Sequence, residues 1–168
     1  MTVTAEILAR LKINQAGNND FGGPNFTPVL ETLINLTNGV AANQADLAFV
    51  DERTVGAGAT DSIDLSGVLT DAFGATITAA EIVALMIINK RRAGTPLNST
   101  DLTIGGGANG VFASAMPFVL KPGAVLLLAA GDAAGVKTVT AGTADILTVV
   151  NGANASNMYQ LAILARSA

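Results

Sequence analysis

The chain has 168 residues, enough for one domain with a sizeable core; half of them are hydrophobic and only 13% are charged. Its net charge of −4 argues against nucleic acid as the main partner, because phosphate binding needs a basic surface. The chain has no Cys and no His, which excludes disulfides, thiolate chemistry and imidazole bases or ligands. The apolar runs 82–88 and 124–130 are far shorter than the roughly 18 residues of a membrane span, so no membrane partner is expected.

The N-terminal region, residues 1–44, is predicted to hold a strand followed by an arm or loop. Odd positions from 7 to 13 are apolar and alternate with mostly polar ones, which is typical of a strand. Ile7, Leu8 and Leu11 would also form the stripe of a short helix. Residues 14–28 are rich in Asn, Gly and Pro, and predict an irregular loop or a flexible arm. The first ten residues lack the pattern of a signal peptide, so assembly in a cytoplasm is expected.

The rest of the chain, residues 45–168, is predicted to form one β-sandwich, with strand 29–37 preceding it. Short apolar or alternating segments are separated by turn residues, and no segment looks like a crossover helix. Asn38-Gly39, Asn109-Gly110 and Asn151-Gly152 predict type I′ hairpin turns, and Pro122-Gly123 predicts a tight turn. The run 82–89 is compatible with a central strand or a buried helix. The fold class is therefore all-β, a single β-sandwich or jelly-roll-like domain with an N-terminal arm or extra strand. Its expected strands are 46–55, 60–65, 82–89, 102–104, 118–121, 125–129, 136–140, 146–150 and 158–165.

The stretch "TDSIDLSGVLTDAFGATIT", residues 60–78, is the densest group of oxygen-bearing side chains. Asp61, Asp64 and Asp71 could ligate calcium, but their spacing fits no EF-hand loop. Paired-carboxylate hydrolysis would need two acids facing a cleft, which the sequence does not indicate. The favoured interpretation is structural, with Asp64 pointing outward from a strand and Asp71 capping a turn.

Two further motifs have competing interpretations. Residues 104–110, "IGGGANG", have the glycines of a phosphate-binding loop but not the Lys-Ser/Thr ending, which favours a surface loop. Lys90, Arg91 and Arg92 form the one basic cluster. They are interpreted either as a charged strand end that keeps an edge soluble or as a docking site for an acidic protein.

Catalysis is not expected. Without His, a nucleophilic Ser or Thr would need a Lys or carboxylate base, and neither G-x-S-x-G nor S-x-x-K occurs. We therefore predict no catalytic residue, no cofactor and no metal site.

Three stretches resemble small virion proteins of tailed bacteriophages. They are the acidic strand and turn ending in "DLSGVLTDAFG", the Pro-Gly segment "VLKPGAVLLLAAGDAAG", and the final "TAGTADILTVVNGANASNMYQLAILARS". The similarity covers residues 45–168, with a weaker echo in "LKINQAGNNDFGG". It implies a β-rich structural protein on the phage head, a capsid decoration (cement) protein that is commonly trimeric or dimeric. A tail, fibre or receptor-binding component that touches host glycans is the alternative, and a carbohydrate-acting enzyme is a remote one.

The expected role is binding to the major capsid protein on the outer head surface, bridging coat subunits in the virion. The high apolar content predicts self-association, and we expect a homo-oligomer, with a trimer favoured. The expected partner-binding residues are Phe21 and Phe26 in the arm, followed by Lys90, Arg91 and Arg92. A flexible arm with spaced aromatic side chains fits a groove on a neighbouring subunit or on the capsid.

Overall fold

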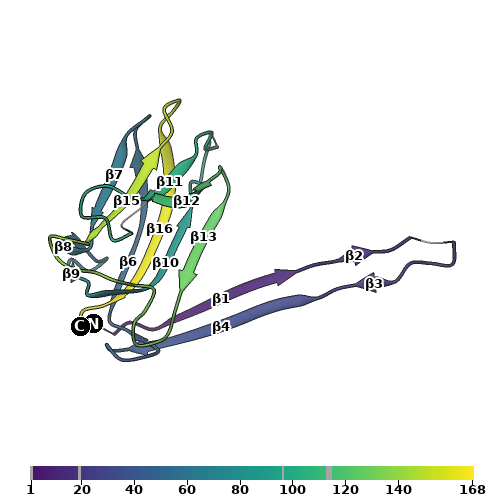
Figure 1. The fold of residues 1–168 in the computed structure, drawn as a ribbon, viewed down its shortest axis with the longest axis horizontal. Helices are drawn as coiled ribbons and strands as arrows, with labels where there is room; N and C mark the ends of the chain where they lie inside the picture. Colours follow the sequence, from purple (N-terminus) through teal and green to yellow (C-terminus); the bar gives the residue numbers. More distant parts are fainter. Residues whose placement is uncertain (1, 19, 96, 113–114) are drawn as a thin grey trace.

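The computed structural model describes residues 2–18, 20–95, 97–112 and 115–168. Within these ranges the chain forms strands and turns and no helix, so none is present that could cross a membrane. The all-β prediction is confirmed. Two antiparallel sheets form a sandwich, and a long two-stranded arm extends away from it (Figure 1).

The two sheets of the sandwich contain most of the strands. The first sheet has the spatial order β13 (Val125–Ala129), β10 (Glu81–Ile88), β16 (Asn157–Arg166) and β6 (Leu47–Val55), and β14 (Lys137–Thr138) also pairs with β10. The second sheet has the order β12 (Ala115–Leu120), β11 (Leu102–Gly105), β15 (Ile146–Asn151) and β7 (Thr60–Asp64). Successive strands therefore pass repeatedly from one sheet to the other.

The arm is a hairpin that begins beside the sandwich. Strand β1 (Ala5–Lys12) pairs antiparallel with β4 (Val29–Asn38) along its whole length. Beyond them, β2 (Gln15–Ala16) pairs with β3 (Asn25–Phe26) at the far end, which Figure 1 shows well clear of the sandwich. After the arm, β5 (Gln44–Ala45) runs parallel to the end of β4 and leads the chain into β6.

The segment 14–28 is more regular than an irregular loop. Ile13 N donates to Pro28 O at 3.0 Å, and Gly17 N donates to Pro24 O at 2.9 Å, so the hairpin ladder continues past β1. A Cβ added at Gly23 would lie 1.5 Å from Gly17 O, so only glycine permits this approach of the two chains. The Asn- and Gly-rich composition did not indicate this ladder, because its hydrogen bonds join backbone groups and require no apolar side chains.

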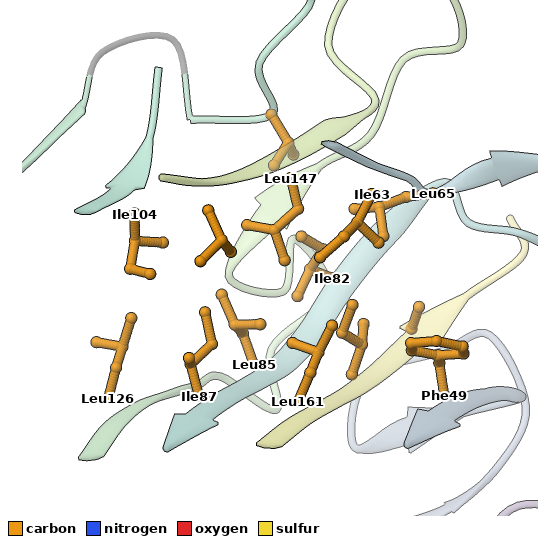
Figure 2. Close-up of a cluster of buried hydrophobic side chains, with 14 of the residues drawn as sticks. Phe49, Ile63, Leu65, Ile82, Leu85, Ile87, Ile104, Leu126, Leu147 and Leu161 are labelled. Carbon is orange, nitrogen blue, oxygen red and sulfur yellow. The ribbon is translucent and has the colours of Figure 1, made fainter. Parts of the chain in front are cut away.

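The core lies between the two sheets. Figure 2 shows Leu85, Ile87 and Leu161 of the first sheet pointing toward Ile104 and Leu147 of the second. These side chains are all almost completely buried, as expected from alternation in a sandwich. The hairpin of β8 (Ser66–Thr70) and β9 (Thr76–Thr78) closes one end of this core with apolar side chains.

Most expected strands are present, but several turn predictions are wrong. Strand β14 has only two residues of the predicted 136–140, and β8 occupies a stretch that was expected to be turn. Asn151 is a buried residue at the end of β15 rather than part of a type I′ turn, and neither residue of the pair has a positive φ. Asn38 and Gly39 end β4 without starting a hairpin, because the next strand runs parallel to it. Asn109 does have a positive φ, but it lies in a loop and not in a two-residue hairpin.

The predicted tight turn at Pro122-Gly123 is confirmed, but the two strands that it connects do not pair as a hairpin. Ala124 N donates to Lys121 O at 2.9 Å and Gly123 has φ 82°, the geometry of a type II turn. The strands on either side, β12 and β13, belong to different sheets. The turn therefore carries the chain across the sandwich.

Candidate functional site

The two faces of the β1–β4 ladder differ in chemistry. Directly paired residues share a face, and one face carries only apolar residues and one Thr. We call it the apolar arm face; it consists of Ala5, Ile7, Ala9, Leu11, Leu30, Thr32, Ile34 and Leu36. The opposite face includes the Arg10–Glu31 ion pair at 3.2 Å, beside Lys12. The two faces therefore differ most in the distal half, since Leu8 and Leu33 add an exposed apolar pair to the opposite face nearer the root.

The root of the apolar arm face is packed on the outer face of the first sheet. Leu36 is buried together with Val3 and Val83, and Ile7 and Ile34 pack against this group. This second cluster lies on the side of the sheet away from the main core. It anchors the arm to the sandwich.

The distal half of the same face has no sheet beneath it. Leu11 and Leu30, a directly paired couple, are 57% and 59% exposed. Such an exposed apolar pair on a regular ladder is the expected appearance of a contact surface for another chain. The sequence alternation indicated the strand, but only the position of the arm shows which half of the strand is uncovered.

The predicted aromatic residues lie in the distal part of the arm. Phe26 is in β3 and is 63% exposed, and Phe21 lies in the connection between β2 and β3 and is 99% exposed. The predicted basic residues lie elsewhere, directly after β10 in the sandwich. The structure does not bring the two groups together into one site.

The basic cluster is partly engaged with neighbouring strands. The carbonyl of Lys90 accepts a hydrogen bond from the Gln160 side chain at 2.9 Å. Nη2 of Arg91 contacts Met158 Sδ at 2.7 Å, and Arg92 N donates to a Glu52 carboxylate oxygen. These contacts hold the backbone of the cluster against β16 and β6. The side chains of Lys90 and Arg92 remain exposed.

The three carboxylates of residues 60–78 have separate structural roles. Asp71 accepts hydrogen bonds from the backbone N of Phe73 and of Ala75 at 2.8 and 2.9 Å, which confirms the predicted capped turn. Asp64 accepts from Ser66 N at 2.8 Å at the end of β7. Asp61 lies on the same face of β7 as buried Ile63. The stretch therefore shapes strand ends and turns.

Asp61 belongs to a partly buried polar group that the sequence did not indicate. Arg53 donates to both carboxylate oxygens at 2.7 and 2.8 Å, and the Tyr159 hydroxyl donates at 2.8 Å. Burial alone would raise the pKa of Asp61, but the hydrogen bonds from Arg53 and Tyr159 outweigh it and leave that pKa below its usual value. Burial, followed by the charge of Asp61, raises the pKa of Tyr159. The sequence feature that could have indicated this group is the position of Asp61 two residues before Ile63, which places both side chains on the inward face of β7.

A second internal polar network links the two sheets at the end of β10. The amide of Asn89 donates to the carbonyls of Thr100 and Leu120 at 2.9 and 2.8 Å. Asn157, fully buried at the start of β16, donates to Asn89 Oδ1 at 3.0 Å. These amides donate hydrogen bonds to buried backbone carbonyls at the end of β10, so their role is structural.

In the glycine-rich segment 104–110, Ile104 and Gly105 end β11, and residues 106–110 form a loop that returns to β15. Asn109 O accepts from Ile146 N at 2.9 Å, and Val111 N donates to Ile146 O at 2.8 Å. The loop thus extends the hydrogen bonding of the second sheet. Asp145 at its base has a pKa below the usual value because Ser66 Oγ and then Gly142 N donate to it.

The described part of the chain places no group of three acidic side chains where it could hold a metal ion. Two open hollows flank the arm root, and the larger, of about 470 Å³, lies beside Val3, Val50 and Phe73. The other, of about 330 Å³, is lined by residues of β1 and by Met86, Leu127 and Ala162 of the first sheet. Comparisons with protein-family models, with curated proteins and with solved structures found no match. The candidate functional site is therefore the arm together with the apolar outer face of the first sheet.

Proposed function

We propose that this chain is a structural protein of a bacteriophage virion, which decorates the outer surface of the head and bridges coat subunits. The observation that carries the proposal is an amphipathic hairpin arm that extends beyond a closed and well-packed sandwich (Figure 1). The sandwich has its own core and gains little from the distal arm, where apolar side chains are exposed. Such an arm is useful for reaching another molecule.

The order of the strands supports an assembly role. Counted along the chain within the sandwich, the eight main strands occupy the orders 6-3-8-1 and 5-4-7-2 in the two sheets. This order supports assignment to the jelly rolls, an architecture that recurs in viral capsid proteins as well as in lectins and cupins. The architecture alone does not specify a function, so the arm remains the deciding feature.

Within this proposal the end of the arm docks on the coat. Phe21 and Phe26 are the residues that would enter a groove there, because each buried ring contributes about 2 kcal/mol or more. Lys90 and Arg92 offer a second contact, toward an acidic surface of the major capsid protein.

The test uses heads from which this protein has been removed. The purified chain should re-bind and co-sediment with such heads, and the F21A/F26A double variant should bind at least about tenfold more weakly. Phe73→Ala is the matched control, because Phe73 is 80% exposed and lies in the β8–β9 turn, outside the arm. Equal loss with both variants would remove the arm from the docking surface.

Labelling of the intact virion decides the location. Antibody bound to this chain should decorate the head in electron micrographs. Label confined to the tail or fibres would replace the decoration role by the tail role. Absence of the chain from purified virions would overturn the proposal altogether.

A further inference from the structure

We propose that the distal half of the apolar arm face of one copy packs on the outer face of the first sheet of a second copy. The occupant of both uncovered apolar surfaces is thus another molecule of this chain. The inference rests on the proposed function only in treating the arm as an assembly device, and it names the partner and the surface.

The arm root already provides an example of this contact. Leu36 and Ile34, at the root of the apolar arm face, are packed on the outer side of β10 and β16 beside Val83 and Leu164. Leu11 and Leu30 continue the same face beyond the Ala9–Thr32 pair. A second outer sheet face of the same kind would therefore fit the distal half as the first fits the root.

The outer face of the first sheet has such an uncovered area. Leu126 of β13 and Ile87 of β10 point into the core. Because side chains alternate along a strand, the adjacent Val125 and Met86 point outward. The outward apolar residues above the arm root are exposed Val125 and half-buried Met86, Ile88, Leu127 and Ala162, and on β6 Val50 is 77% exposed. The outward positions of the edge strand β7 in the second sheet differ, because they are Thr60, Ser62 and Asp64.

The exposed area of the chain is also that of an incomplete assembly. Its accessible surface is 9193 Å², whereas a compact monomer of 16.9 kDa exposes roughly 7,700 Å². The excess of about 1,500 Å² is more than the roughly 800 Å² per partner of a standard protein interface. A partner that covers the distal arm and the sheet face would bring the exposed area to the usual range.

The charges orient the contact. The distal half of the apolar arm face holds no charged residue, while the distal half of the opposite face carries Arg10, Glu31 and Lys12. Packing of the apolar face on a second sheet leaves these three charges in water, so no unpaired charge is buried. The opposite orientation would bury them against an apolar sheet.

Cysteine cross-linking tests the pairing directly, because the chain has no Cys of its own. Leu11→Cys and Val125→Cys are prepared as separate single variants and mixed under mild oxidation. We expect the yield of disulfide-linked dimer in the mixture to be at least fivefold higher than the yield from either variant oxidised alone. Val68→Cys, exposed on β8, replaces Val125→Cys in the control mixture and should not cross-link to the arm above background. Equal cross-linking in both mixtures would overturn the pairing.

Charged substitutions test which face of the arm is used. Leu11→Arg should raise the dissociation constant for self-association in analytical ultracentrifugation by at least tenfold. Leu33→Arg is the matched control, since Leu33 is exposed on the opposite face, and it should leave the association within about twofold. Circular dichroism establishes that each variant is folded, and the cysteine pair remains decisive if one is not. A larger effect of Leu33→Arg would place the contact on the other face.

The result separates the two proposals. A wild-type chain that stays monomeric at micromolar concentration and gives no specific cross-link, yet re-binds stripped heads, overturns this pairing and leaves the decoration role in place. A chain that self-associates through Leu11 and Val125 but binds no heads supports the pairing and overturns the decoration role.

Discussion

Strands β10 and β1 both carry apolar residues at every second position, but the side chains at these positions are buried in β10 and mostly exposed in distal β1. In β10, Leu85 and Ile87 face the second sheet and are completely buried. In β1, Ile7 is half-buried at the root, while Leu11, on the same face, is mostly exposed. Strand β1 alternates and β10 is apolar throughout, yet both segments form strands, and burial depends on what lies opposite each side chain. Buried apolar side chains between the two sheets stabilise the sandwich, whereas the distal arm is held by the backbone hydrogen bonds between β1 and β4.

The largest expected effect is in the sandwich core. Leu85→Ala removes a completely buried side chain from the centre of the cluster in Figure 2, and we expect a loss of about 3–4 kcal/mol. Leu30→Ala, the matched change in the distal arm, should cost less than about 0.5 kcal/mol. Chemical denaturation of both variants measures the difference. A similar cost at the two sites would mean that the distal arm contributes to the fold of the single chain.

The next largest effect concerns the Arg53–Asp61–Tyr159 group. Asp61→Asn should lower stability at pH 7 by about 2–3 kcal/mol, because the partly buried Arg53 loses its carboxylate partner. The pKa of Asp61 is lower in the folded chain, so its stabilisation is complete above the unfolded-state value of roughly 3.9 and is lost as the pH falls through the folded-state value.

The difference in melting temperature between Asp61→Asn and the wild type should therefore shrink below about pH 4. Asp51→Asn is the matched control, since Asp51 meets the same Arg53 at 3.3 Å but is 45% exposed. It should cost at most about 0.5 kcal/mol. An Asp61→Asn difference that is constant with pH would show that the stabilisation does not depend on the ionised carboxylate.

A smaller effect is expected at the capped turn between β8 and β9. Asp71→Ala removes the acceptor of two backbone hydrogen bonds, and a loss of about 1 kcal/mol, or roughly 2–4 °C in melting temperature, is expected. Asp101→Ala breaks an exposed ion pair with Lys121 and should change the melting temperature by less than about 2 °C. Calorimetry of both variants makes the comparison.

The smallest effect on stability is expected from removal of the arm tip. Replacement of residues 14–27 by Asn-Gly should change the melting temperature by less than about 2 °C, because the side chains described in this segment are exposed and the β1–β4 ladder is retained. Deletion of residues 1–28 is the contrasting variant, since it also removes buried Val3 and leaves β4 without its partner. It should be clearly less stable. Equal melting of the two would mean that the arm root does not stabilise the sandwich.

Several features of the fold could be predicted because local chemistry determines them. Alternation at positions 7–13 predicted β1, the continuous apolar run at 82–89 was compatible with β10, and Asp71 capped the expected turn. Pro122-Gly123 formed its tight turn for the same reason, as proline and glycine restrict the backbone wherever they occur. Each of these outcomes depends on neighbours within a few residues.

The topology and the candidate site depended on distant partners. Whether the turn at Pro122-Gly123 joins two paired strands or crosses the sandwich depends on the sheets that accept β12 and β13. Whether Asp61 faces water or Arg53 depends on the packing of β6, β7 and β16.

The exposure of Leu11 and Leu30 was likewise decided by tertiary structure, because the arm extends beyond its own sandwich (Figure 1). The amino-acid sequence by itself determined that this protein is a β-sandwich with an alternating N-terminal strand. The tertiary structure decided which apolar residues remain uncovered, since burial is a property of two surfaces and the alternation describes only one of them.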